Sequence, residues 1–344
     1  MPAARPNTTL GIENRPNRSG NAGPEILTDG FGVVIEERDE DQRFNSDFTE
    51  ATAALTWNRP NGDIGNFNGS FALFNFHTRE ASFRFPVDGV DNQRIFRRGE
   101  DEWNSEVSGD YQFGLGPGKL KLIGLYRAEN SDFASETLEA FEDARPLDIS
   151  RFNQDVFESE VIARAEYDIS PRQGRDWQFS IEAARNVLDA DSSFFLLDSN
   201  GVFVEELLDN ADTRVEERRA ETNVTYSRRL TPKLSLQSSI GVEYSELSQS
   251  GPTGQTRDFF RPKGFISAAW QGSPRFAVTA RVEREVGQLN FFDFVSSVNL
   301  NIENEDEGNP DLVPSQTWAG EIEFERNFGD AGAATLRLYG DLIS

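Results

Sequence analysis

The feature of this sequence that most constrains its fold is an alternation of apolar and polar residues that recurs in pairs of runs. Between Leu234 and Tyr244 every second residue is apolar except Ser238, and the residues between them are polar, charged or glycine. Because successive side chains of a β-strand point to opposite faces, this pattern predicts a strand with one apolar and one polar face. Another alternating run ends where this one begins, at residues 230–233, so the two runs predict a β-hairpin.

Six hairpins of this kind follow one another along the chain. Their tight turns, rich in Gly, Pro, Asn or Asp, lie at residues 59–63, 114–118, 170–174, 230–233, 271–274 and 329–332. Longer polar segments join one hairpin to the next, at about residues 86–101, 129–153, 188–214, 247–259 and 285–314. In an up-and-down barrel every second connection lies on the same rim, so this sorting predicts one rim of short turns and one of long loops. Within the third long segment, residues 198–201 predict a further tight turn and a projecting β-ribbon.

Composition excludes several classes of function. The chain of 344 residues has a net charge of -25, from 59 acidic and 34 basic residues, whereas a nucleic-acid partner requires a basic surface. There is no Cys and a single His, His77, so we expect no disulfide, no metal site, no cofactor and no catalytic residues. We interpret His77 as a residue of the barrel rim, and we do not expect an enzyme.

The apolar faces could meet either a second sheet or lipid. No run approaches the roughly 18 apolar residues of a membrane-spanning helix, and the first 20 residues lack the apolar core of a secretion signal. Neither absence argues against membrane-spanning strands, which are short and half polar. The predicted strands have about ten residues or more, the length that crosses a bilayer at a tilt.

Two sets of residues favour lipid over a soluble β-sandwich. Aromatic residues gather on the apolar face near the short turns, as in the interfacial girdle of a membrane barrel. The proposed girdle consists of Trp57, Tyr111, Tyr167, Trp177, Tyr226 and Trp270. The opposite face carries rows of charges that a dry core would not accept. The resulting candidates for facing the lumen are Glu158, Glu160, Arg164, Glu321, Glu323 and Glu325.

Three stretches late in the chain resemble the barrel domain of TonB-dependent outer-membrane receptors. They are FFRPKG at residues 259–264, VGQLNFFDF at 286–294 and GNPDLVPSQTWAGEIEFER at 308–326. Within the last stretch, Asn309, Pro310, Leu312 and Pro314 are similar to the family's Asn-Pro-x-Leu-x-Pro segment, which enters a late barrel strand. The resemblance is specific around residues 258–340 and architectural before that.

The resemblance implies a fold and a function. The fold is an all-β, transmembrane, antiparallel up-and-down barrel, here with about 12–14 strands of the 22 that the family has. Residues 1–30 are expected to be an irregular segment and 31–344 an incomplete barrel domain, with a possible first strand at Phe31–Glu37. The family's plug domain, its contact with the TonB system and its closing strand are not visible in the sequence, and the charged lumen candidates would face such a plug as much as a pore.

The function implied is the TonB-energised uptake of a bulky, scarce solute from outside a Gram-negative cell. A ferric siderophore, another metal chelate or an oligosaccharide would fit. The expected partners are the lipid bilayer of the outer membrane, the chain's own plug domain, the TonB system and an extracellular small-molecule ligand, with no nucleic acid. Two alternatives stay open: a passive outer-membrane porin and a soluble β-sandwich binding module.

Overall fold

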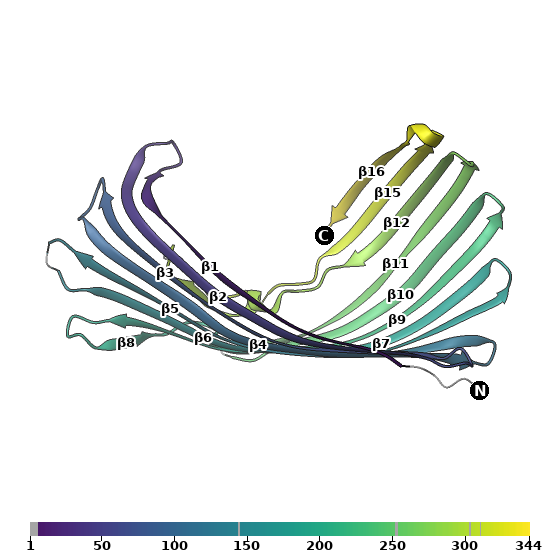
Figure 1. Ribbon diagram of the computed structural model, residues 1–344, viewed down its shortest axis with the longest axis horizontal. Helices are drawn as coiled ribbons and strands as arrows, with labels where there is room; N and C mark the ends of the chain where they lie inside the picture. Colours follow the sequence, from purple (N-terminus) through teal and green to yellow (C-terminus); the bar gives the residue numbers. More distant parts are fainter. Residues whose placement is uncertain (1–5, 144, 252–253, 303, 310) are drawn as a thin grey trace.

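The chain forms one curved antiparallel sheet. The computed structural model describes residues 6–143, 145–251, 254–302, 304–309 and 311–344, and 14 of its strands belong to this sheet. Thirteen of them lie side by side in chain order, whereas β8 pairs only with β7. Figure 1 shows the sheet bent into a trough, with the edge strands β1 and β16 on opposite sides of its opening. The prediction of an all-β, antiparallel, up-and-down architecture of about 12–14 strands is confirmed.

Most strands are long, and their bounds show where each hairpin turns. The sheet consists of β1 (Pro6–Thr28), β2 (Val34–Asn58), β3 (Ile64–Pro86), β4 (Asn92–Leu115), β5 (Gly118–Phe141), β6 (Asp148–Arg172), β7 (Arg175–Leu197), β8 (Phe203–Glu206), β9 (Asp212–Thr231), β10 (Leu234–Gln249), β11 (Thr256–Ser273), β12 (Phe276–Val286), β15 (Gln316–Asn327) and β16 (Ala333–Ile343). Two short strands, β13 (Ser297–Asn299) and β14 (Asn304–Asp306), pair with each other, and two short 3-10 helices are η1 (Phe291–Phe294) and η2 (Gly329–Ala331). Within the described part of the chain, neither helix has the length and apolar character needed to cross a membrane.

All six predicted hairpins are present. The first turn shows how the sequence closes them: the Gly62 amide donates to the Arg59 carbonyl at 2.9 Å, and Gly62 has a φ of 91°, a conformation that glycine adopts without strain. The predicted turn at 198–201 is also present. There the Asp198 amide donates to the Val202 carbonyl at 2.8 Å and β7 continues into β8.

The predicted long loops are mostly strand, which corrects the sequence interpretation. β3 and β4 extend so far that only residues 87–91 connect them, and only 142–147 connect β5 with β6. In this region both faces of the sheet carry polar side chains, so the alternation that marks a strand is missing. Backbone pairing and cross-strand ion pairs hold the strands together instead, as between Arg97 and Glu136 at 3.2 Å. Of the five segments, 287–315 is the one that remains largely outside the main sheet.

The expectation for the N-terminal residues is also wrong. Residues 6–28 form strand β1, where the sequence predicts an irregular segment, and they pair with β2 from Pro6 opposite Trp57 to Thr28 opposite Val34. The early strand expected at Phe31–Glu37 overlaps the β1–β2 turn and the start of β2. β1 carries few apolar side chains, and its pairing with β2 supplies the backbone hydrogen bonds that no sequence pattern shows.

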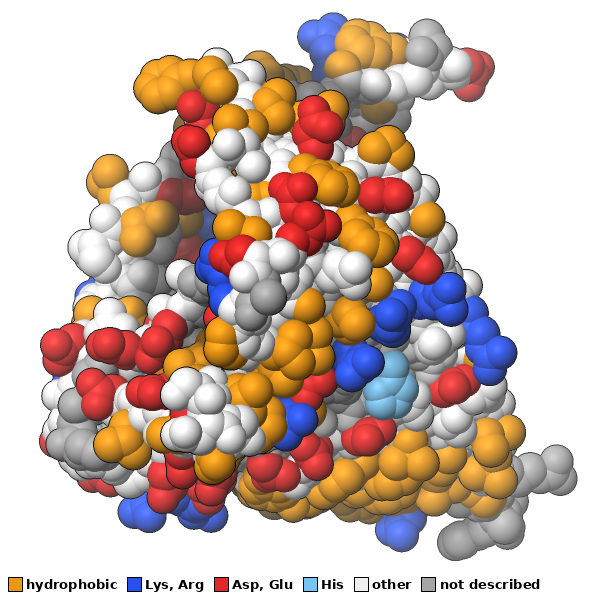
Figure 2. Space-filling view, turned by 90° about the vertical axis from the view of Figure 1, so that its left-hand side faces the viewer, with side chains coloured by type: hydrophobic (Ala, Val, Ile, Leu, Met, Phe, Trp, Pro, Cys, Tyr) orange, Lys and Arg blue, Asp and Glu red, His pale blue; other side chains and the backbone are white. Residues whose placement is uncertain are grey.

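The two faces of the sheet differ in chemistry. Large apolar side chains on the convex face are exposed: Ile181 by 59%, Ile240 by 72% and Phe260 by 69%. Figure 2 shows hydrophobic side chains gathered along the lower edge of the side that it presents. A soluble sandwich would bury these residues under a second sheet, but the second sheet among the described residues is the three-residue pair β13–β14. Near the tight turns, the convex face is therefore an apolar surface that no other described part of the chain covers.

The core lies on the concave face. Segment 287–315, between β12 and β15, runs back into the trough (Figure 1) and packs apolar side chains onto the inner wall. Three clusters form there: Val298 and Leu300 lie against Phe96 and Phe152, and Val295 lies against Leu188. In the third cluster, Phe294 lies against Val215 and Leu247.

Candidate functional site

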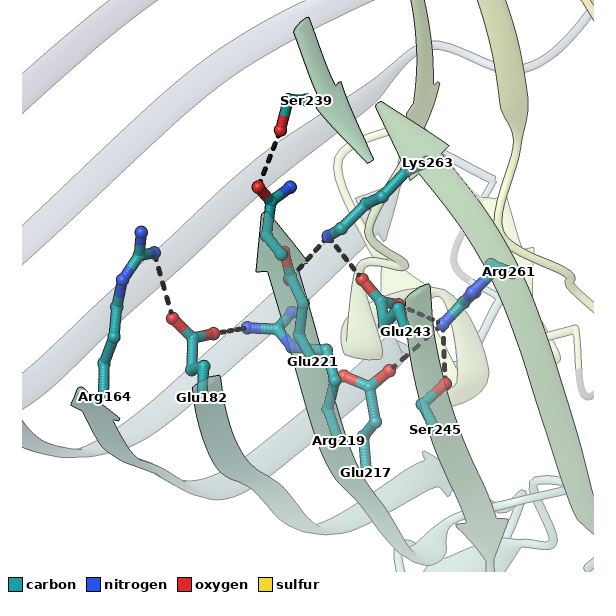
Figure 3. A network of polar contacts seen from close by, with 11 residues as sticks. Arg164, Glu182, Glu217, Arg219, Glu221, Ser239, Glu243, Ser245, Arg261 and Lys263 are labelled. Carbon is teal, nitrogen blue, oxygen red and sulfur yellow. Dashed lines mark hydrogen bonds and ion pairs between the residues drawn. The ribbon is translucent and has the colours of Figure 1, made fainter. Parts of the chain in front are cut away.

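A network of charged side chains covers the concave wall formed by β6, β7, β9, β10 and β11 (Figure 3). Every second residue of each strand points into the trough, so in-register pairing brings charges on neighbouring strands together. Arg164 Nη1 lies 3.4 Å from Glu182 Oε2, and Arg219 Nη2 lies 3.2 Å from Glu182 Oε1. Glu182 is thus held between two guanidinium groups on the strands at its sides.

The second half of the network is centred on Arg261. Its Nη2 donates to Glu243 Oε1 at 2.7 Å and to Ser245 Oγ at 2.6 Å. Lys263 Nζ lies 2.9 Å from Glu243 Oε2 and 2.5 Å from Glu221 Oε2. The Arg261 side chain is only 4% exposed, and its Nε and Nη1 have no hydrogen-bond partner among the described residues. Buried guanidinium donors without a partner are uncommon, and here the guanidinium lies over the Phe259 ring, 5.0 Å from its centroid.

Nearer the other rim, a second charged group anchors segment 287–315. Arg94 is almost fully buried and donates to the Leu300 carbonyl and, at 3.0 Å, to Asn301 Oδ1. Glu139 Oε1 lies 3.2 Å from Arg94 Nε. Burial lowers the pKa of the nearby Arg84 guanidinium below its usual value, and the positive charge of Arg94 lowers it further. The anchoring of the segment therefore depends on a compact set of buried charges.

Side-chain amides and a guanidinium fix the backbone of segment 287–315 along its length. Gln154 donates to the Ser296 carbonyl at 3.2 Å, and Gln249 donates to the Phe294 carbonyl at 3.3 Å. These bonds replace the ladder partners that a strand would have, which is why the segment is ordered without being part of the main sheet. Further bonds of this kind run from Asn210 to the Glu307 carbonyl at 2.9 Å and from Arg257 to the Leu312 carbonyl at 2.7 Å.

The six lumen candidates all lie on the concave face. Glu158 and Glu160 line a hollow of about 240 Å³ whose far side is formed by residues 288–291. Arg164 belongs to the network on the wall, where its Nη2 is 2.7 Å from Glu166 Oε1. The remaining candidates follow one another along β15, and Glu321 is paired with Arg337 of β16. Glu323 and Glu325 lie opposite Thr279 and Ala277 of β12.

Sequence reasoning missed most of the residues that make this site. Arg219, Glu243 and Arg261 occupy inward positions of predicted strands or extended ends, and the alternation could have found them. The role of Arg94 and the inward path of segment 287–315 could not have been found from the sequence. Arg94 contacts Leu300 and Asn301, which lie 206 and 207 positions further along the chain. Among the described residues, no group of three or more His, Cys, Asp or Glu side chains could hold a metal ion.

The proposed girdle residues lie near the short turns on the convex face. Two pairs of their rings are adjacent: Trp57 and Tyr111 have centroids 6.3 Å apart, and Trp177 and Tyr226 have centroids 4.4 Å apart. The Tyr167 hydroxyl donates to the Leu115 carbonyl at 3.0 Å. Trp270, 46% exposed, lies 6.1 Å from Phe276. The rings thus form a band along one rim.

The family-like motif lies at the end of segment 287–315, just before β15. The Asn309 amide donates to the Asp293 carbonyl at 2.7 Å, Leu312 packs against the Phe294 cluster and Pro314 is buried. Pro310 lies outside the described residues. His77 is exposed in the middle of β3, and not at the barrel rim as the sequence interpretation expects.

Comparison with known proteins gives structural similarities only. No family description and no curated protein matches the sequence. Similar solved structures include the hemophore receptor HasR of Serratia marcescens, with 11% identity over 97% of this chain and 54% of the receptor and a TM-score of 0.48. The siderophore receptor PiuA of Acinetobacter baumannii has 8% identity over 95% of this chain and 56% of its own, with a TM-score of 0.46. FpvA of P. aeruginosa, solved with bound pyoverdines, has 8% identity over 94% and 47%, with a TM-score of 0.47.

These three receptors are TonB-dependent receptors, the family that the motifs of the sequence resemble. The chain spans about half of their length.

Proposed function

We propose that this chain forms part of the wall of an outer-membrane β-barrel receptor that takes up a bulky solute. The observation that carries the proposal is the division of one sheet into an exposed apolar convex face and a charged concave face. Exposed apolar surface of this extent is costly in water and stable in lipid, whereas ion-paired charges require a wet interior. The sheet therefore separates hydrocarbon from an aqueous lumen.

The aromatic band supports one orientation of the sheet in the membrane. In the proposed placement, the girdle residues near the short turns lie at the periplasmic interface, because amphipathic rings favour the headgroup depth. The long polar hairpins at the other rim then project outside the cell, where they are available to contact a ligand. The six lumen candidates face the aqueous interior, or the polar surface of a plug domain.

The inner wall supports a receptor rather than an enzyme. In the network of Figure 3 the carboxylates are paired with guanidinium and ammonium groups on neighbouring strands. We propose that uptake is driven by the TonB system through the plug, and that the solute is a ferric siderophore, another metal chelate or an oligosaccharide. No cofactor and no covalent step is required.

A passive porin is the second candidate, because segment 287–315 folds inward and narrows the space within the trough.

The two functions differ in their need for energy. Cells that express the complete gene would be given a radiolabelled ferric siderophore, with and without a protonophore. Uptake that the protonophore abolishes supports the receptor; uptake that persists, together with steady ion conductance in planar bilayers, would support the porin instead.

A further inference from the structure

A hollow lies between the inward segment 287–315 and the concave wall, and its lining is largely aromatic. Its volume is about 310 Å³. Four phenylalanines line it: Phe96 of β4, Phe133 of β5 and Phe152 of β6 from the wall, and Phe292 from the segment. The rings of Phe133 and Phe152 have centroids 6.3 Å apart and meet at an angle of 57°. An occupant of the hollow would therefore contact aromatic rings from both the wall and the segment.

Carboxylates border the same hollow. Glu100 and Glu129 belong to its lining. Glu158 of β6 lies in register opposite Glu129 of β5, although like charges at directly opposite positions destabilise a sheet. Glu102 shares the concave face with Glu100, because residues two positions apart on a strand point the same way. The aromatic hollow thus lies beside a group of negative charges contributed by three neighbouring strands.

Cations compensate these carboxylates only in part. Arg127 Nη2 lies 2.7 Å from Glu129 Oε2. Arg98 also lines the hollow, but its guanidinium lies over the ring of Phe76 on β3, 5.7 Å from the centroid. Among the described residues, the carboxylates of Glu100 and Glu158 form no ion pair. The border of the hollow therefore has an excess of negative charge.

A buried hydroxyl in the lining is a second and independent sign of a ligand. Ser135 of β5 lies in register opposite Phe152 and is 6% exposed. Its Oγ has no hydrogen-bond partner among the described residues. Buried polar side chains nearly always have a partner, so a polar group bound in the hollow would satisfy this hydroxyl.

The lining distinguishes between classes of cation. Within the described part of the chain, no group of three or more His, Cys, Asp or Glu side chains could hold a metal ion. Phenylalanine rings also offer no oxygen ligands to replace the water around a small inorganic cation. An alkylated ammonium group, in contrast, is attracted to the faces of aromatic rings through its charge and contacts them through its alkyl groups. Carboxylates at the border add a Coulomb attraction.

We propose that this hollow binds an alkylated ammonium group of the solute. Exposed residues of the inward segment, Phe292 at 42% and Asn299, belong to the lining, so a solute in the trough can reach the hollow. The rings contact the alkyl groups, the carboxylates attract the charge, and Ser135 bonds to a neighbouring polar group. The inference deepens the proposed function and rests on it, because it assigns a positively charged organic group to the solute.

The test uses the folded protein in detergent micelles and isothermal titration calorimetry. Choline is the probe, and the neutral alcohol in which a carbon replaces the nitrogen of choline is its counterpart of equal shape. We expect choline to bind the wild type about tenfold more tightly, because only choline gains from the ring faces and the carboxylates. Phe133→Leu should weaken choline binding about fivefold and Glu100→Gln roughly tenfold. Neither variant should change binding of the alcohol by as much.

The matched controls are Phe74→Leu and Glu323→Gln, at concave positions of β3 and β15 that do not line the hollow. Both should bind choline as the wild type does. Three results would overturn the inference: no binding of choline, equal affinity for choline and the alcohol, or equal losses in variants and controls. The receptor function has a separate readout in protonophore-sensitive uptake. Such uptake without choline binding contradicts only the cation site, whereas selective choline binding without such uptake contradicts only the receptor function.

Discussion

The two ends of the long strands follow different rules. Near the tight turns, each strand has one apolar and one polar face, and large side chains such as Ile181 and Ile240 are exposed on the convex side. Near the other rim, both faces are polar or charged, yet β3, β4 and β6 continue without a break. Comparing the two ends shows that the alternation of apolar and polar residues reflects the environment on each face of a strand, whereas the formation of the strand depends on backbone pairing.

The core distinguishes the same two regions. At the tight-turn end the concave wall is held by ion pairs, as between Arg164 and Glu182. At the other end, segment 287–315 covers the wall and provides apolar contacts around Phe294. The membrane would stabilise the first region from outside, and the folded segment stabilises the second from inside.

The largest effect is expected from the inward segment. Phe294 is 1% exposed, so Phe294→Ala should weaken the attachment of the segment by about 3–5 kcal/mol through lost burial and an unfilled cavity. Hydrogen exchange of residues 287–315 should accelerate while exchange in β6 and β7 near the tight turns stays slow. Phe292→Ala is the matched control, because Phe292 is 42% exposed. Equal acceleration in both variants would show that the segment is not seated through Phe294.

The next effect separates the two ends of the convex face. Ile181→Arg places a charge in the apolar belt and should destabilise the protein by about 2–4 kcal/mol in a bilayer. Phe83→Arg, at a similarly exposed site near the other rim, should change stability by no more than about 0.5 kcal/mol. Urea unfolding in phospholipid vesicles measures both. Equal costs at the two sites would remove the distinction between a lipid-facing and a water-facing part.

A smaller effect is expected within the aromatic band. Tyr167→Phe keeps the ring and removes the hydroxyl that donates to the Leu115 carbonyl. The loss should be about 1 kcal/mol, the usual net contribution of such a hydrogen bond. The same unfolding assay detects it, and an unchanged midpoint would mean that the ring alone positions this residue.

The smallest effect concerns the turn between β7 and β8. The Val202 amide, followed by the Asn200 side chain, holds the pKa of Asp198 below its usual range. Because the pKa of Asp198 is lower in the folded turn than in the unfolded chain, its charged carboxylate stabilises the turn at pH values above the unfolded pKa. This stabilisation is lost as the pH falls through the folded pKa. Amide exchange at Val202, corrected for intrinsic rates, should therefore be faster at pH 3 than at pH 6. In Asp198→Asn the difference between the two pH values should vanish.

The sequence predicts the region near the tight turns well. All six hairpins follow from alternation and turn residues, because one apolar face and one polar face leave a clear period of two. The concave position of residues such as Glu158 and Glu321 follows from the same period. That these residues face an aqueous lumen, and that the aromatic band lies at a lipid interface, remain predictions that depend on the proposed membrane placement.

The rest of the fold has no local signal. β1 is held by its neighbour β2, and the extended ends of β3 to β6 are held by cross-strand pairs such as Arg97 with Glu136. The path of segment 287–315 depends on contacts with strands far away in the sequence, such as that between Arg94 and Leu300. The structure of these regions is therefore determined by tertiary pairing and not by the intrinsic strand propensity of their residues.

The proposed division of one sheet between lipid and water can be measured directly along β10. The natural chain has no cysteine, so single cysteines introduced at residues 236–243 can each carry a spin label in reconstituted vesicles. We expect oxygen, which dissolves in lipid, to relax labels at 236, 240 and 242, and a water-soluble nickel complex to relax labels at 237, 239 and 243. Accessibility without this period of two, or access of the nickel complex to both faces, would contradict the account.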